Sequence, residues 1–229
     1  MRQVSAILLH NTKSTKMLKL YPAKMPFLVP FIFPSLTYAK PDNANQIYLT
    51  FDDGPHPEIT PWILMVLKKY HIKANFFCTG ANIQAYPHIV KEIIAQGHQI
   101  GNHTFSHVDA WRTSHKKYIH EISETDRLLQ TAGISSKLFR PPYGRLTPGL
   151  IKKIQSLNKE IEIVMWSILM GDFSRFFVPD YAISYLSHHI KAGDILVFHD
   201  NAHSFPRLKQ VLDPVINTLL TKGYRFATL

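Results

Sequence analysis

The feature that most constrains this chain is a repeated pattern in which a short apolar run, typical of a β-strand, ends in an acid or a histidine. The residues that follow these runs include Asp52, Asp53, His103 and His199. In α/β barrels and doubly wound sheets, active sites form at the carboxyl ends of parallel strands. The sequence therefore predicts a site at one edge of a parallel sheet, and its acids and histidines favour a metal-dependent hydrolase.

Strand-like and helix-length segments alternate from Gln46 to the end of the chain. Several helical segments open with proline or end at glycine, as helix boundaries commonly do. The predicted strands are residues 47–51, 74–78, 99–101, 137–140, 161–166, 195–198 and 224–227. The predicted helices are residues 61–70, 87–96, 116–131, 148–157, 179–190 and 208–222. This order favours an α/β fold, a deformed (β/α) barrel of about seven parallel strands, over an open sheet.

Length and composition agree with one such domain. The chain has 229 residues, of which 45% are hydrophobic, and this suits one barrel around a single core. The single cysteine, Cys78, excludes an internal disulfide, and its apolar neighbours indicate a buried thiol rather than a nucleophile. The formal net charge of +10 favours anionic surroundings. Because the chain carries no nucleic-acid-binding motif, the charge is interpreted as general surface character.

Residues 1–45 precede the predicted catalytic domain, which covers residues 46–229. Lysines are followed by an apolar stretch and then by small residues, which is an incomplete version of a signal peptide. The apolar stretch is interrupted by Pro26, Pro30 and Pro34 and is too short to span a membrane. Two interpretations stay open, an export signal and an apolar arm packed on the bottom of the barrel. A cytoplasmic and an envelope-associated location both stay open, as does the oligomeric state.

Two acids and two histidines form the first candidate site. Asp52 and Asp53 are adjacent at a strand end, so one carboxylate can bind a cation while the other accepts a proton. Asp-Gly-Pro is also ordinary turn chemistry. If the segment from His103 to His107 is helical, both imidazoles share one face and can hold one Zn²⁺-type ion. With Asp53 they offer three ligands and leave a position open for water, as catalytic metal sites do.

Two further segments carry candidate catalytic groups. Arg140 can grip a carboxylate with two N–H groups, and the backbone N–H of Tyr143 can face a developing oxyanion. His199 is a candidate general acid, and Asp172 can orient either His199 or Arg140. A plain rigid loop and a structural histidine are the alternatives at these two places. Asp200 is interpreted as a helix or loop cap.

Taken in order, these motifs closely resemble the polysaccharide deacetylase family, the NodB-homology domain of carbohydrate esterase family 4. The resemblance covers about residues 46–229. It rests on the segments Thr50-Phe-Asp-Asp-Gly-Pro55, His103-Thr-Phe-Ser-His107, Arg140-Pro-Pro-Tyr143, Asp172-Phe173 and Val197-Phe-His199. It implies a deformed (β/α) barrel that hydrolyses the acetyl groups of N-acetylated sugars, with a glycan as partner and no nucleic acid.

The resemblance also implies a role for each motif residue. The implied metal ligands are Asp53, His103 and His107. The implied catalytic groups are the general base Asp52, its neighbour Arg140, the backbone oxyanion donor Tyr143, the general acid His199, and Asp172, which tunes that acid. Two imidazoles and a carboxylate favour Zn²⁺, although Co²⁺, Ni²⁺ or Mn²⁺ also fit. Other histidines lack a motif position. Among them, His98 is interpreted as a structural residue and the pair His188-His189 as a surface pair on a helix.

The chain departs from the family pattern at three positions. Leu169 stands where an additional acid is common, Phe173 replaces the usual tryptophan, and Val197 replaces the usual leucine. The two hydrophobic replacements are expected to reshape the pocket that takes the acetyl methyl group. Leu169 is expected to weaken control over the pKa of the general acid.

The function favoured by the sequence is metal-dependent N-deacetylation of an N-acetylglucosamine-type glycan, such as a chitin oligomer or peptidoglycan, with release of acetate. One alternative is a hydrolase that uses the same fold and metal chemistry on a cyclic or other non-sugar amide. A second is a non-catalytic carbohydrate-binding protein, which the intact set of candidate site residues argues against. The natural glycan stays open.

Overall fold

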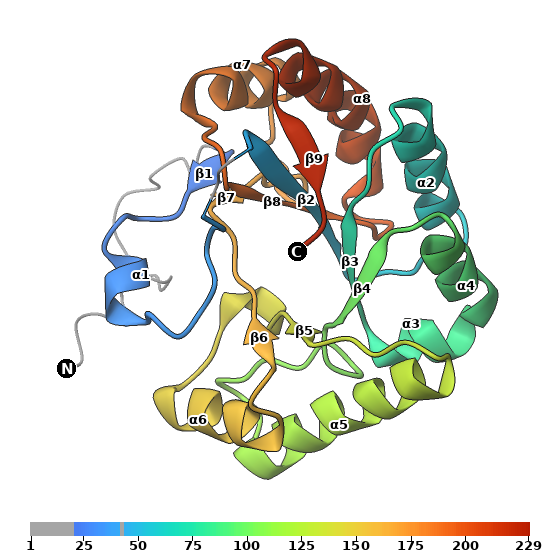
Figure 1. Ribbon diagram of the computed structural model, residues 1–229, viewed down its shortest axis with the longest axis vertical. Helices are drawn as coiled ribbons and strands as arrows, with labels where there is room; N and C mark the ends of the chain where they lie inside the picture. The colour runs from blue at the N-terminus through green and yellow to red at the C-terminus, as the bar shows by residue number, and fades with distance from the viewer. Residues whose placement is uncertain (1–20, 42–43) are drawn as a thin grey trace.

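The computed structural model describes residues 21–41 and 44–229 of the chain. Across these residues, nine strands form one sheet that curls into a half-barrel, and helices cover its outer side (Figure 1). The strand order is β1-β7-β8-β2-β3-β4-β5-β6, and β9 pairs with β2. Every pair is parallel except β1 with β7. The predicted deformed barrel of mostly parallel strands is therefore confirmed.

All seven predicted strands are present, with boundaries that differ by a few residues. They are β2 (Gln46–Asp52), β3 (Asn75–Cys78), β4 (Gln99–Asn102), β5 (Leu138–Phe139), β6 (Glu162–Ile163), β8 (Ile195–His199) and β9 (Arg225–Ala227). Two strands of two residues each, β1 (Ala23–Lys24) and β7 (Ile168–Leu169), were not predicted. Strands of two residues are too short to show a periodic pattern in the sequence. Their position depends instead on the strand with which they pair.

The six predicted helices are also present. They are α2 (Ile59–Lys69), α4 (Pro87–Ala95), α5 (His115–Thr131), α6 (Pro148–Leu157), α7 (Pro179–His189) and α8 (Phe205–Thr221). Side-chain caps fix two of the starts, since Ser114 accepts a hydrogen bond from Lys117 N and Thr147 accepts one from Leu150 N. The sequence prediction missed the short helices α1 (Val29–Ile32) and α3 (Gly80–Ala85).

Strand β2 shows how the fold places polar groups beside a core. Its outward residues, Ile47, Leu49 and Phe51, are buried against the helices in the main hydrophobic cluster. Side chains alternate between the two faces of a strand, so the residues between these point into the barrel. Tyr48 joins the apolar cluster inside the barrel, whereas Asp52 ends the strand at the rim. The interior therefore changes from apolar to charged along one strand.

The segment from residue 21 to residue 41 lies along the open side of the barrel, between β6 and β7 (Figure 1). Its strand β1 pairs with β7, Thr37 bridges to Val164, and Ala39 bridges to Asp194. Val29 is buried in the second hydrophobic cluster. The segment thus runs along the side of the barrel to the starts of the strands. Residues 1–20, on which the predicted arm or export signal also falls, lie outside the described residues.

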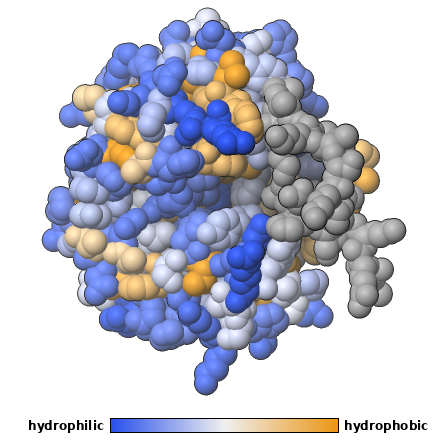
Figure 2. Space-filling model, turned by 180° about the vertical axis from the view of Figure 1, so that it is seen from behind, coloured by the Kyte–Doolittle hydropathy of each residue, from blue (hydrophilic) through white to orange (hydrophobic). Residues whose placement is uncertain are grey.

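The face of the molecule opposite to the view of Figure 1 is mostly polar. In the space-filling view, hydrophilic residues cover much of the face shown, and hydrophobic residues gather in separate small groups (Figure 2). Within residues 21–41 and 44–229, no helix has both the length and the apolar character that crossing a membrane requires.

Candidate active site

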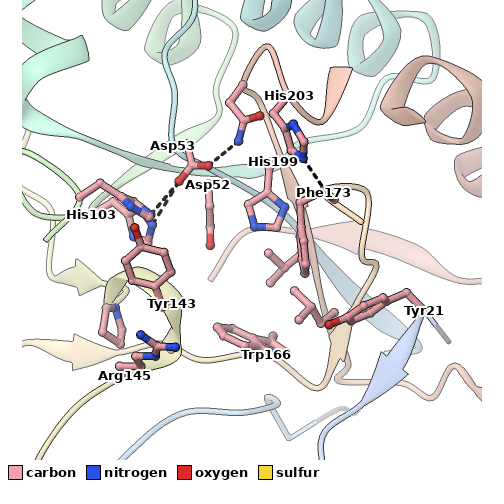
Figure 3. A pocket seen from close by; sticks show the side chains of 16 residues that line it. Tyr21, Asp52, Asp53, His103, Tyr143, Arg145, Trp166, Phe173, His199 and His203 are labelled. Atoms are coloured by element: carbon pink, nitrogen blue, oxygen red, sulfur yellow. Dashed lines mark hydrogen bonds and ion pairs between the residues drawn. The ribbon is translucent and has the colours of Figure 1, made fainter. Parts of the chain in front are cut away.

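The carboxyl ends of the strands bring the predicted residues to one pocket. Asp52 and His199 lie side by side, because β2 and β8 pair in that register. A cavity of about 410 Å³ opens there, and its lining includes Asp52, Asp53, His103, His107, Tyr143 and His199 (Figure 3). The other two predicted residues, Arg140 and Asp172, are fully buried behind this lining. All eight predicted site residues therefore belong to one region.

Asp53, His103 and His107, called here the Asp-His-His group, converge in the pocket. Asp53 Oδ1 lies 3.1 Å from His107 Nε2 and 3.6 Å from His103 Nε2. All three ligand atoms fall within 4.8 Å of one another. Asp53 Oδ1 is buried. Its contacts with the two histidines do not have hydrogen-bond geometry, and this oxygen has no hydrogen-bond partner among the described residues. A buried oxygen and two imidazole nitrogens aimed at one point form a donor set that fits a divalent metal ion.

The charge of Asp53 suits this arrangement. Burial raises the pKa of its carboxyl, but the neighbouring His103 and His107 outweigh burial and hold that pKa well below the usual value. The carboxylate is therefore ionised at neutral pH, which is the form that binds a cation.

The histidine pair does not lie on a helix, so the helical condition behind its prediction is wrong. Residues 103–107 form a loop in which Thr104 and His107 have φ angles of 61° and 56°. This left-handed backbone bends the loop back, and the two imidazole rings lie 5.1 Å apart. Asp53 and Tyr143 also have positive φ. Backbone strain of this kind, roughly 1 kcal/mol or more per residue, gathers at functional sites where the surroundings hold it.

Helix α5 holds the histidine loop in place. Asn102 donates hydrogen bonds to Ile122 O at 2.8 Å and to Asp126 Oδ1 at 2.7 Å. Its own side-chain oxygen accepts from Thr104 N at 2.8 Å. At the other end of the loop, Ser106 N donates to the Glu121 carboxylate at 2.7 Å. These supports were not predicted from the sequence, because they pair the ends of the loop with a helix further along the chain.

The ring of His103 has a defined orientation. Its Nδ1 lies 2.7 Å from the carbonyl oxygen of Arg140, which can only accept a hydrogen bond. The proton must therefore be on Nδ1, which leaves Nε2, facing Asp53, as the atom that a neutral ring offers to a metal ion. A backbone acceptor of this kind fixes the tautomer of histidines that ligate metals.

Asn201 is a residue of the site that sequence reasoning missed. Its Nδ2 donates to Asp53 Oδ2 at 2.6 Å, and its Oδ1 accepts from Ser204 N at 2.9 Å. The amide thus occupies one carboxylate oxygen and leaves Asp53 Oδ1 facing the histidines. Its position two residues after His199 was the only available signal.

Arg140 anchors Asp52 from inside the barrel. Its Nη1 donates to Asp52 Oδ1 at 2.6 Å and to Thr50 Oγ1 at 2.7 Å. Its Nε and Nη2 donate to the carbonyl oxygens of Val164 and Met165. The predicted two-pronged grip is therefore wrong, because the remaining donors satisfy backbone carbonyls. Burial lowers the pKa of the guanidinium, and the nearby Asp52 offsets this only in part.

His199 forms a pair with Asp172. Its Nδ1 lies 2.8 Å from Asp172 Oδ1, and its backbone N–H donates to Asp172 Oδ2 at 2.9 Å. Asp172 therefore orients His199 and not Arg140. Burial alone would lower the pKa of His199. The charge of Asp172 and its hydrogen bond have a larger, opposite effect and raise this pKa to about 9. The imidazole is protonated at neutral pH.

The opposite side of the pocket is apolar. It consists of Tyr21, Trp166, Leu169, Phe173 and Val197, which together are called here the apolar wall. The three positions that depart from the family pattern all belong to it. Phe173 packs its ring against His199 at 5.2 Å, nearly perpendicular to it. Tyr21 and Trp166 were not predicted from the sequence to belong to the site.

The remaining candidates have structural surroundings. Asp200 is buried and accepts a hydrogen bond from Thr60 Oγ1 at 2.6 Å, so it holds the first turn of α2. Burial raises the pKa of its carboxyl well above the usual value. His98 and Cys78 are buried, as predicted. The pair His188-His189 is exposed at the end of α7, also as predicted.

Comparison with known proteins fits this geometry. The polysaccharide deacetylase family model matches residues 39–161, more than half of the 229 residues. The chain belongs to the polysaccharide deacetylase family. A peptidoglycan-N-acetylglucosamine deacetylase of Bacillus cereus is 36% identical over 193 residues, which cover 84% of this chain and 70% of that protein. A chitooligosaccharide deacetylase of Sinorhizobium fredii is 32% identical over 159 residues, covering 69% and 73%.

Solved structures of deacetylases are similar to this family member. A peptidoglycan N-acetylglucosamine deacetylase, crystallised with 4-naphthalen-1-yl-N-oxidanyl-benzamide, has a TM-score of 0.80 and 33% identity, covering 90% of this chain and 95% of that one. A pseudoenzyme of the same esterase family, from Bacillus anthracis, has a TM-score of 0.74 and 25% identity, covering 84% and 66%. The fold therefore occurs both with and without activity.

Proposed function

We propose that this polysaccharide deacetylase family member is a metal-dependent hydrolase that removes N-linked acetyl groups from N-acetylglucosamine-type residues of a glycan. The observation that most strongly supports this proposal is that the Asp-His-His group shares one pocket with two proton-transfer groups, each held by its own partner. Asp52 is held by Arg140, and His199 is held by Asp172. A metal-binding group, a base and an acid around one cavity match the needs of amide hydrolysis.

Asp53, His103 and His107 would hold the metal ion. The donor set suits Zn²⁺, and Co²⁺, Ni²⁺ or Mn²⁺ are also compatible. When bound, such an ion polarises the acetyl carbonyl and lowers the pKa of water toward ~7. Asn201 would keep Asp53 Oδ1 directed at the ion, because its amide already occupies the other oxygen.

Asp52 would act as the general base. The Arg140 guanidinium fixes one carboxylate oxygen at 2.6 Å, which sets the direction of the carboxylate. The other oxygen has no hydrogen-bond partner among the described residues and lies at the pocket. It would take the proton from the water molecule that attacks the acetyl carbon.

His199 and Tyr143 would complete the reaction. The protonated His199 would give a proton to the departing amine nitrogen, so the C–N bond breaks with release of acetate and a free amine. The backbone N–H of Tyr143 would stabilise the oxyanion that forms during attack, and one donor of this kind contributes roughly 3 kcal/mol. Its left-handed backbone presents this segment to the cavity.

The identity of the amide is supported by the relatives. The Bacillus cereus and Sinorhizobium fredii relatives are deacetylases of peptidoglycan N-acetylglucosamine and of chitooligosaccharides, so an N-acetylated glucosamine unit is the substrate class we propose. The pseudoenzyme makes activity a question to test, because similar folds occur without it.

A substrate panel tests this proposal. Zn²⁺-loaded protein is incubated with N-acetylchito-oligosaccharides and, separately, with small cyclic imides, and acetate and ring-opened products are measured. Acetate release from the sugars is the expected result. Hydrolysis of the imides alone would replace the glycan with another amide, and turnover of neither would place this chain with the non-catalytic members of its family.

A further inference from the structure

Tyr21 enters the pocket from a segment that precedes the region matched by the family model, which begins at residue 39. Strand β1 pairs with β7 so that Ala23 lies opposite Leu169, a residue of the apolar wall. Met25 N donates to Ser167 O at 2.7 Å and continues this attachment. Because β1 is antiparallel to β7, the residues before it extend toward the rim, and Tyr21 reaches the cavity.

The ring of Tyr21 is packed tightly. It lies against Gly171, where an added Cβ would collide with the tyrosine ring and where φ is +81°. It also contacts Phe173 at 5.3 Å in an edge-to-face arrangement, and Phe173 contacts His199 in turn. Tyr21 therefore lies one ring further from the reacting groups than Phe173. Tyr21 is therefore available to the sugar part of a substrate whose acetamide lies at the reacting groups.

The hydroxyl of Tyr21 is not needed for this packing. Among the described residues it has no hydrogen-bond partner, so phenylalanine would make the same ring contacts with Gly171 and Phe173. Figure 3 shows Tyr21 across the pocket from Asp53 and His103, with its hydroxyl directed into the cavity. Tyrosine combines an apolar ring face with a polar tip, and a sugar offers both a C–H face and hydroxyl groups.

We propose that Tyr21 is a specificity-determining residue whose hydroxyl hydrogen-bonds to a hydroxyl group of the substrate sugar, with its ring forming part of the wall beside that sugar. This inference rests on the proposed function. It makes Tyr21, at the start of the segment from residue 21 to residue 41, part of the substrate site as well as part of the fold.

The test compares Tyr21→Phe with the unaltered full-length protein, both loaded with Zn²⁺, on N-acetylchito-oligosaccharides. Loss of one neutral hydrogen bond to substrate is expected to raise KM by about two- to tenfold, with kcat changed by less than about twofold. Tyr21→Ala also removes the ring and is expected to raise KM further. Tyr181→Phe, on helix α7 outside the pocket, is the matched control and should leave both constants unchanged.

The outcomes separate this inference from the proposed function. An unchanged KM in Tyr21→Phe, or a fall in kcat at constant KM, would overturn the role of the hydroxyl while leaving deacetylation in place. The second result would instead indicate an effect on His199 through Phe173. Absence of acetate release from the unaltered protein would overturn the proposed function, and this inference with it.

Discussion

The Asp-His-His group and the apolar wall face each other across one pocket, but they are built differently. The first is held by directional hydrogen bonds, such as Asn201 to Asp53 and His103 to the Arg140 carbonyl. The second is held by ring packing, such as Tyr21 on Phe173 and Phe173 on His199. Directional bonds fix atoms for chemistry, whereas packing fixes a shape. We therefore expect changes on the first side to abolish turnover and changes on the second to alter which substrate is preferred.

The largest effect is expected from His103→Ala. Removing one of three ligand side chains should abolish tight metal binding and acetate release together. Elemental analysis of the purified protein and an acetate assay check this, with the exposed His120→Ala as the control. Stoichiometric metal in His103→Ala would show that the histidine is not a ligand.

Asp52→Asn should separate metal binding from catalysis. Asparagine keeps the shape of the side chain but cannot take a proton, so kcat should fall by roughly 10²- to 10⁴-fold while metal content stays the same. The surface variant Asp180→Asn serves as the comparison. Loss of the metal from Asp52→Asn would mean that Asp52 is a ligand rather than the base.

The pH profile should report the pair of His199 and Asp172. A general acid must be protonated, and the pKa of His199 is raised to about 9, so activity should persist through neutral pH and fall as pH rises past about 9. In Asp172→Asn this alkaline limb should move down toward the ordinary histidine pKa of about 6.5, a roughly thirtyfold loss at pH 8. A limb that stays in place in the variant would remove Asp172 from this role.

Asn201→Ala is expected to weaken metal binding by about tenfold, because the outer oxygen of Asp53 loses its partner and the carboxylate can rotate. Competition with a chromogenic chelator measures this affinity. Asn217→Ala, an exposed position on α8, should behave like the unaltered protein. Equal affinities in both variants would show that the Asp53 carboxylate does not depend on Asn201.

The smallest effect is expected on the apolar wall. Val197→Leu adds one methylene to the cavity lining. One methylene in a closely fitted pocket changes discrimination by roughly tenfold at the low end, and a smaller change is expected here because the apolar wall forms only one side of the cavity. The ratio of kcat/KM for N-acetyl over N-propionyl substrates should rise by a few-fold, with kcat for the acetyl substrate nearly unchanged. A collapse of kcat instead would mean that this wall takes part in the chemistry.

The contrast between the two sides also explains what the sequence could predict. The strand ends and their acids and histidines are local patterns, so Asp52, Asp53 and His199 could be placed at one rim in advance. Spacing brought His103 and His107 together as expected, but a left-handed loop rather than a helix does so. That backbone depends on support from α5, which a local pattern does not contain.

The apolar wall and the N-terminal segment were much less predictable. Tyr21 reaches the pocket only because β1 pairs with β7, which is far away in the sequence and only two residues long. Asn201 acts through one hydrogen bond to a distant strand end. Neither produces periodicity or a spacing rule, so only the three-dimensional arrangement reveals them.

The most direct test of the central claim is a titration of metal-stripped protein with Zn²⁺, in which bound metal and acetate release from N-acetylchito-oligosaccharides are followed on the same samples. A metal-dependent deacetylase should have no activity at the start, gain activity in proportion to occupancy, and stop gaining it at one ion per chain. Acetate release that does not depend on occupancy, or full occupancy without release, would contradict metal-dependent deacetylation.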